Sequence, residues 1–190
     1  MDKTISDKLS LFERLDYAVA LFIRENIHGP RLNRILSQIN RGEMMLLLII
    51  PYLAYAAWNH LLPYPWWIVI PYAGLIAYAN DRSVLALKKM ISRKRPLVTV
   101  AGKVDQNPDM KHSFPSAHAS NSMTAALVLV FLFGFPEWFL VLSLMAGIGR
   151  LLSLHHFPSD VIGGWVIGTC FGSLGLFLGR WLLPYCFGTT

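Results

Sequence analysis

The sequence predicts an all-α protein, built as a polytopic membrane helix bundle of about five transmembrane helices behind an amphipathic N-terminal helix. Hydrophobic residues make up 54% of its 190 residues, and the mean hydropathy is +0.45. Both values are too high for an ordinary soluble domain. In addition, five apolar stretches approach the roughly 20 residues that a helix needs to cross a bilayer. We expect a single membrane-embedded domain over residues 1–190.

The first predicted element is an amphipathic helix over residues 9–27. Its apolar residues recur at helical spacing on one face; they are Phe12, Leu15, Val19, Phe22 and Ile23. Charged residues interrupt the stretch, which favours a helix that lies in the membrane interface. The alternative is a sixth span. The following residues, up to 43, are rich in arginine and are predicted to be a surface connection, so that 1–43 forms an interfacial segment.

The predicted bundle covers residues 44–183, and a short tail follows at 184–190. The five spans are expected at 44–62, 66–87, 119–135, 138–154 and 161–183. Pro51 is a candidate kink in the first span. The second span requires Asp81 and Arg82 to face protein or the interface. In the last span, glycines recur at four-residue spacing and predict close contact with a neighbouring helix; they are Gly164, Gly168, Gly172, Gly175 and Gly179. A polar loop is expected at 97–114.

The charge pattern argues against nucleic acid as a partner. The net charge is +6, but five of the 17 Lys and Arg residues lie between Lys88 and Arg95, beside an apolar span and without a nucleic-acid motif. An anionic ligand at a membrane surface fits this placement better. Cys170 and Cys186 do not suggest a disulfide framework. We expect no cleavable signal peptide, because the first residues carry charges of both signs.

Three short clusters combine residues suited to phosphate chemistry. They are Lys88-x6-Arg95-Pro96, then Pro115-Ser116-Ala117-His118, and finally Arg150-x5-His156-x3-Asp160. Two spans separate the second cluster from the third, and no span separates the first from the second. The three clusters are therefore predicted to meet at one face of the bundle.

The first cluster supplies cations. Lys88 and Arg95 are about two helical turns apart and share a face if the helix persists, while Pro96 is expected to turn the chain. An arginine grips phosphate with two parallel hydrogen bonds, and a lysine adds a point charge. The remaining cations of this stretch are predicted to attract anionic lipid headgroups; they are Lys89, Arg93 and Lys94.

The second and third clusters supply the reactive groups. Ser116 is a good helix N-cap, and a helix start attracts anions, which would place His118 near a bound phosphate. Ordinary capping beside an interfacial histidine is the alternative. Arg150 lies near the end of a span, where an ionisable residue suggests function. Asp160 falls in the first turn of the last helix and is suited to orient His156 as a nucleophile.

Some of these residues also have a simpler interpretation. Asp160 is alternatively a first-turn charge, with His156 an interfacial histidine. The neighbouring His155 is predicted to be structural.

Neither histidines nor carboxylates form a compact metal-binding pattern, and the surrounding cations would repel a metal ion, so we expect neither a metal nor another cofactor.

These motifs resemble those of the type 2 phosphatidic acid phosphatase family of membrane lipid phosphatases, whose pattern is K-x6-R-P, P-S-G-H and S-R-x5-H-x3-D. Two positions depart from it, because Ala117 and Gly149 stand where the family has glycine and serine. The resemblance implies that His156 is the nucleophile that forms a phosphohistidine, that Asp160 orients it, and that His118 protonates the leaving group. The phosphoryl oxygens would be held by Lys88, Arg95, Ser116 and Arg150.

The resemblance implies a hydrolase of lipid metabolism, acting on a phosphate or pyrophosphate group of a membrane lipid. Phosphatidylglycerophosphate, phosphatidate, undecaprenyl pyrophosphate and a lipid A phosphate are the candidate substrates. It also implies an integral protein of the bacterial inner membrane, with the active site facing the periplasm or outer side. A lipid phosphotransferase and a non-enzymatic lipid-binding membrane protein are the alternatives.

Overall fold

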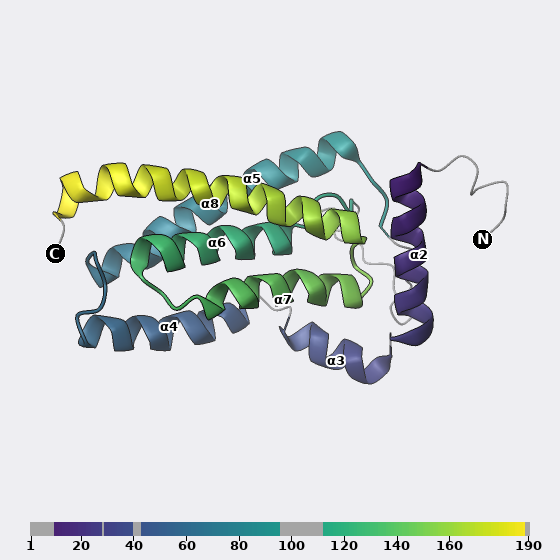
Figure 1. Ribbon diagram of the computed structural model, residues 1–190, viewed down its shortest axis with the longest axis horizontal. Coiled ribbons are helices and arrows are strands. Elements are labelled where there is room, and N and C mark those ends of the chain that lie inside the picture. Colours follow the sequence, from purple (N-terminus) through teal and green to yellow (C-terminus); the bar gives the residue numbers. More distant parts are fainter. Residues whose placement is uncertain (1–9, 28, 40–42, 96–111, 189–190) are drawn as a thin grey trace.

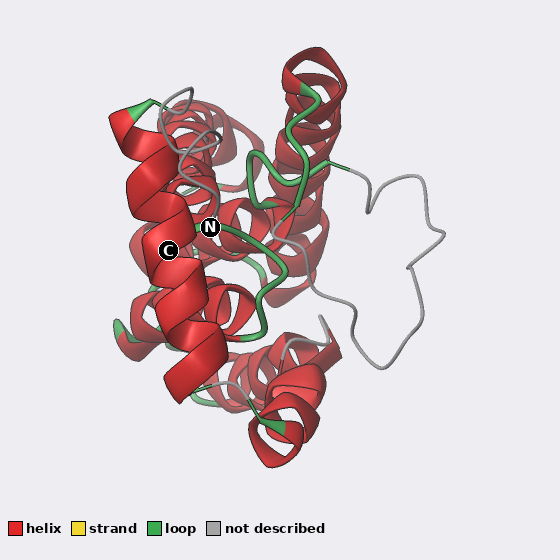
Figure 2. Cartoon of the chain, turned by 90° about the vertical axis from the view of Figure 1, so that its right-hand side faces the viewer, coloured by secondary structure: helices red, strands yellow, loops and turns green. Residues whose placement is uncertain are grey.

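The computed structural model of the chain describes residues 10–27, 29–39, 43–95 and 112–188. Within these ranges the secondary structure is helical (Figure 2), apart from an isolated bridge between Lys94 and His112. The predicted all-α class is therefore confirmed for the described residues. Pro96 and most of the predicted loop at 97–114 lie outside them.

Seven helices follow one another in the described part of the chain. They are α2 (Leu11–Asn26), α3 (Pro30–Ile39), α4 (Glu43–Trp58), α5 (Trp66–Ile91), α6 (Ala117–Phe133), α7 (Trp138–Leu152) and α8 (Pro158–Phe187). Helices α4 to α8 run along the long axis of the molecule, and α2 crosses one end of this bundle (Figure 1). The five stretches predicted as spans correspond to α4 to α8.

Helix α6 is at the centre of the bundle, where it packs against α5, α7 and α8. Most of its apolar side chains are buried, and Phe133 and Val128 are fully inaccessible. The predicted glycine face of α8 lies against it: a Cβ atom on Gly168 would come within 2.4 Å of the Ser120 carbonyl oxygen. Glycine at these positions lets the two backbones approach closely, as small residues do in membrane helix pairs.

The outer surface of the bundle is apolar, as expected of a protein surrounded by lipid. Large apolar side chains are exposed on α4, α5, α7 and α8, including Leu47, Leu75, Val141 and Phe177. Among the described residues, one helix, Pro158–Phe187, is both long and apolar enough to cross a membrane. The other apolar helices are shorter, so the number of spans stays a prediction.

One member of the charged pair in α5, Asp81, meets the condition stated for the second span, and the position of Arg82 at the interface stays a prediction. The Asp81 carboxylate accepts a hydrogen bond of 2.9 Å from the side-chain amide of Asn121 on α6, so it faces protein. Arg82 is exposed, pairs with Asp81 at 3.2 Å and lies over the Tyr78 ring.

The N-terminal amphipathic helix is present as α2, which begins at the capping box of Ser10 and Glu13. Its inner stripe is Asp16, Ala20 and Ile23, and these residues are buried. Most of the predicted apolar face points outward, with Phe12 76% exposed. Ile23 is the exception, because it packs with Ala20 against Leu154 and Phe157. The interfacial position of this helix stays a prediction.

Two stretches that the sequence did not predict as helical are helical in the structure. The surface connection before residue 43 contains helix α3, which begins at Pro30 and packs against α7, with Leu36 buried. A proline suits the first position of a helix because its missing N–H has no intrahelical partner there. The predicted tail at 184–190 is helical as far as Phe187. The Phe187 ring packs edge-on against Trp67, with the ring centroids 5.2 Å apart.

Candidate functional site

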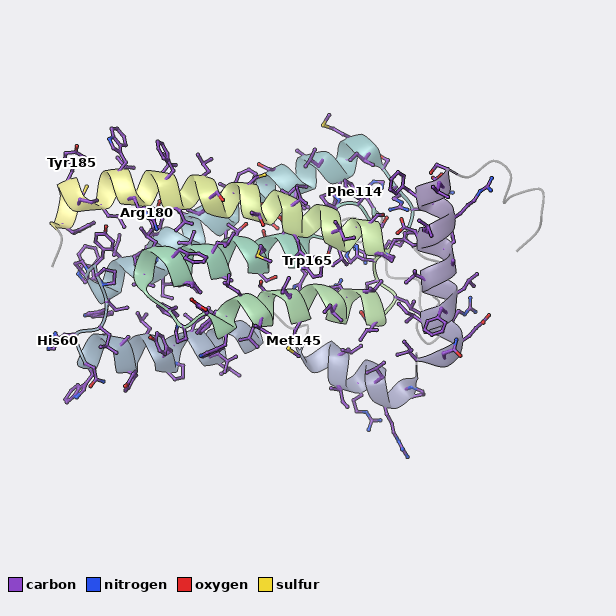
Figure 3. The ribbon with its side chains drawn as sticks, viewed as in Figure 1. His60, Phe114, Met145, Trp165, Arg180 and Tyr185 are labelled. Atoms are coloured by element: carbon purple, nitrogen blue, oxygen red, sulfur yellow. The ribbon has the colours of Figure 1, made fainter. Side chains whose placement is uncertain are left out.

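The three sequence clusters come together at the end of the bundle that α2 crosses. The backbone N–H of Ser116 donates to the Asp160 carbonyl at 2.9 Å, which joins the starts of α6 and α8. The guanidinium of Arg93, in the first cluster, donates to the Asp160 carboxylate at 2.8 Å. Figure 3 shows Phe114, two residues before Ser116, at this end of the bundle and Tyr185 at the other.

The first cluster spans the end of α5 and the segment after it. Lys88 is buried in the last turn of the helix, and Arg95 is half-buried beyond it. The helix ends at Ile91 because Ser92 adopts a left-handed conformation with φ of 50°. The condition for Lys88 and Arg95 to share a helix face, that the helix persists to Arg95, is not met, because the helix ends at Ile91.

The segment that carries Arg93 and Arg95 is held by the residues that precede α6. Ser113 donates its backbone N–H to the Arg93 carbonyl at 2.8 Å, and its hydroxyl donates to the Lys94 carbonyl at 3.1 Å. These two hydrogen bonds hold the end of the first cluster against the residues that lead into α6.

The second cluster begins α6, with Ser116 at the N-cap position as predicted. Its hydroxyl does not cap the helix: among the described residues, the fully buried Ser116 Oγ has no hydrogen-bond partner. Buried polar atoms are nearly always hydrogen-bonded, so ordinary capping does not explain this serine. A phosphoryl oxygen would satisfy it.

The third cluster contains a buried His156–Asp160 pair. The imidazole Nδ1 lies 3.7 Å from Asp160 Oδ2, which is longer than a hydrogen bond but close enough to orient the ring. Asp160 is fully buried in the first turn of α8, which Pro158 begins. Its Oδ2 accepts the backbone N–H of Phe157 at 2.8 Å. With Nδ1 facing the carboxylate, Nε2 is the nitrogen available to a substrate.

The positive charges of two arginines act on the His156 imidazole of this pair. Burial lowers the pKa of His156 to about 4, and the charges of Arg95 and Arg150 act in the same direction, while Asp160 opposes them. The imidazole is therefore neutral at pH 7 and keeps a lone pair. Arg150 also interacts electrostatically with His118 and with Arg95. Among the described residues, the buried Arg150 Nε has no hydrogen-bond partner.

The assignment of Arg93 to lipid headgroups was wrong. Its guanidinium pairs with Asp160 at 2.8 Å and with Asp16 of α2 at 2.6 Å, and it lies 4.5 Å over the Phe157 ring. Sequence reasoning missed Asp16 altogether. The available signal was a single carboxylate on the same helical stripe as Ala20 and Ile23. Lys89 and Lys94 are exposed, in keeping with the role predicted for them.

His155 points to a different environment from His156. Its Nδ1 lies 2.9 Å from Ser153 Oγ and 3.0 Å from the Ser153 carbonyl oxygen, as a structural histidine would. In the part of the chain that the structure describes, no three His, Cys, Asp or Glu side chains gather as metal ligands. Metal independence stays a prediction.

Comparison with known proteins identifies relatives of this chain. The PAP2 superfamily sequence model matches residues 66–182. The chain is 33% identical over 109 residues to the decaprenylphosphoryl-5-phosphoribose phosphatase of Mycobacterium tuberculosis, covering 57% of this chain and 58% of that protein. The protein of the same name from Mycolicibacterium smegmatis is 31% identical over 98 residues, 52% of each chain. The chain thus matches little more than half the length of these relatives.

Two solved structures share the fold. The PAP2 type phosphatidylglycerolphosphate phosphatase from Bacillus subtilis superposes with a TM-score of 0.62 and 20% identity, covering 94% of this chain and 90% of that one. Aquifex aeolicus LpxE superposes with a TM-score of 0.60 and 21% identity, covering 90% and 97%.

Proposed function

The chain belongs to the PAP2 superfamily, and from this premise we propose that it is a membrane lipid phosphatase that works without a metal through a phosphohistidine. The observation that carries the proposal is the His156–Asp160 pair: a buried, neutral imidazole oriented by a carboxylate, within the field of Arg95 and Arg150. A neutral imidazole surrounded by cations suits attack on an anionic phosphoryl group.

The proposed first step is displacement at phosphorus. His156 Nε2 attacks, the bond from phosphorus to the lipid oxygen breaks, and His118, which is protonated when the anionic phosphate is bound beside it, donates its proton to the departing oxygen. The phosphoryl oxygens are held by Lys88, Arg95, Ser116 and Arg150. Charge stabilisation of this kind is often the largest single contribution to catalysis. The unsatisfied Ser116 Oγ and Arg150 Nε support a phosphate ligand at this position.

The proposed second step regenerates the enzyme. His118, now neutral, accepts a proton from water, and the resulting hydroxide oxygen forms a bond to phosphorus. The bond between Nε2 and phosphorus breaks, and inorganic phosphate leaves. The two steps together convert a lipid phosphate and water into a lipid alcohol and phosphate, or remove one phosphate from a pyrophosphate.

The substrate is proposed as a class. The apolar outer surface supports a lipid tail that stays in the bilayer while its headgroup reaches the site. We add a polyprenyl-linked sugar phosphate to the candidates predicted from the sequence, because the curated relatives are named for such a substrate. A bacterial inner membrane location, with the site facing the periplasm, remains part of the proposal.

The test is phosphate release from a panel of purified lipids in detergent, with EDTA present. We expect release by the wild type, loss to the detergent background in His156→Ala, and nearly full activity in the matched control His155→Ala. Trapping a labelled phosphoryl group on the wild type, but not on His156→Ala, would support the intermediate. Release by His156→Ala at the wild-type rate refutes the mechanism. Transfer of phosphate to an added alcohol in place of water would identify a phosphotransferase.

A further inference from the structure

Asp16 of α2 is a buried carboxylate outside the segment that matches the family. The family match covers residues 66–182, whereas Asp16 lies on the N-terminal helix and is only 4% exposed. Burying an ionised carboxylate is unfavourable unless it is paired and hydrogen-bonded. Its partners therefore indicate why an acid is present on the inner stripe of this helix.

These partners all belong to the site. Asp16 Oδ2 accepts from Arg93 Nη2 at 2.6 Å and from the Ser159 hydroxyl. Asp16 Oδ1 accepts the backbone N–H of Ser159 at 3.0 Å, and that N–H belongs to the first turn of α8, where such groups have no intrahelical partner. The other nitrogen, Arg93 Nη1, donates to Asp160 Oδ1 at 2.8 Å. One guanidinium thus connects two buried carboxylates.

We propose that Asp16 is a positioning residue for the active site: through Arg93 and the first turn of α8, the N-terminal helix sets the orientation of the Asp160 carboxylate that faces His156. This inference rests on the proposed function. It assigns a role to a helix that the family match does not include, and it makes α2 a part of the active site.

The geometry of Asp160 explains why such support matters. Asp160 Oδ2 faces His156 Nδ1, so rotation of the carboxylate changes the contact that orients the nucleophile. That rotation is limited on the other side by the bond from Arg93 to Oδ1. Without Asp16, Arg93 loses the carboxylate that holds its second nitrogen. Catalytic groups must be held within about 0.5 Å of their productive geometry.

The test compares charge-removing substitutions on the same helix. Asp16→Asn should lower kcat on the order of 10- to 100-fold, the scale seen when a partner that orients a metal-binding histidine or carboxylate is removed. KM should stay nearly unchanged, because Asp16 does not touch the proposed phosphate site. The matched control is Glu25→Gln, an exposed position on α2, which should behave as the wild type. Rates are measured per folded molecule after size exclusion.

Two further variants separate positioning from folding. Asp16→Glu keeps the charge and should recover part of the lost kcat; it also serves if Asp16→Asn does not fold. If Asp16 acts through Arg93, the double variant Asp16→Asn/Arg93→Gln should be no slower than Arg93→Gln alone. A folded Asp16→Asn variant with wild-type kcat would overturn the inference while leaving the proposed function intact, and losses that multiply in the double variant would overturn the route through Arg93. A wild type that releases no phosphate, even from nitrophenyl phosphate, would refute both.

Discussion

Replacing Gly164 with alanine tests whether close contact between α6 and α8 determines the geometry of the site. A Cβ atom at this position would lie 2.5 Å from the Ser116 carbonyl oxygen and 3.1 Å from Ala119 Cβ, where ordinary contact begins at 3.4 Å. The oxygen belongs to the backbone, so it cannot rotate away. The two helices must separate by nearly 1 Å at the first turns that carry the reactive residues.

The expected cost follows from overpacking. Forcing an extra methyl group into a packed contact destabilises a protein by about 1–3 kcal/mol. Replacing glycine by alanine in a helix gains about 1 kcal/mol, so the net effect alone is ambiguous. Gly74→Ala provides the matched control, because nothing lies within 4 Å of a Cβ there and the helix gain is the same. The two variants should therefore differ in free energy of unfolding by about 1–3 kcal/mol.

The effect on activity should be larger than the effect on stability. Separation of the helices moves Ser116 and His118 away from His156 and Asp160, and a misplacement of about 1 Å can cost 100-fold in rate. We would measure unfolding by SDS titration in mixed micelles, and phosphate release at a temperature where both variants are folded. If Gly164→Ala matches Gly74→Ala in stability and the wild type in rate, the close contact does not determine the site geometry.

Three further predictions concern the chemistry. Phosphate release should persist in EDTA, because the cations of the site can neutralise a phosphoryl group; loss in chelator that a divalent ion restores would contradict this. His118→Ala should lose far more activity on a lipid phosphate than on nitrophenyl phosphate, because a general acid matters most when the leaving oxygen is basic; equal losses would exclude that role. The folded state lowers the pKa of His156 from 6.5 to about 4, so the unfolded chain binds the extra proton between these values and stability should fall as pH drops through them. His156→Asn should remove that part of the slope in unfolding measurements from pH 7 to 4, and an identical slope in both proteins would argue against a neutral buried His156.

Much of the helical layout could be predicted because it depends on local patterns. Apolar stretches located α4 to α8, and glycine spacing identified the face of α8 that packs on α6. Ser116 marked the start of α6, although its hydroxyl does not cap the helix. The predicted second span ends at 87, whereas α5 continues to Ile91; the sequence did not reveal that the helix ends where Ser92 adopts a left-handed conformation.

The sequence by itself determined the fold class and the candidate reactive residues, since bilayer length, helix periodicity and motif spacing are properties of short segments. Only the tertiary structure decided what supports those residues. Arg93 is indistinguishable from its basic neighbours in sequence, and its role depends on two carboxylates 77 and 67 residues away along the chain. Pairing between buried charges is a contact in space, set by how α2, α5 and α8 pack, and no local pattern of residues records it.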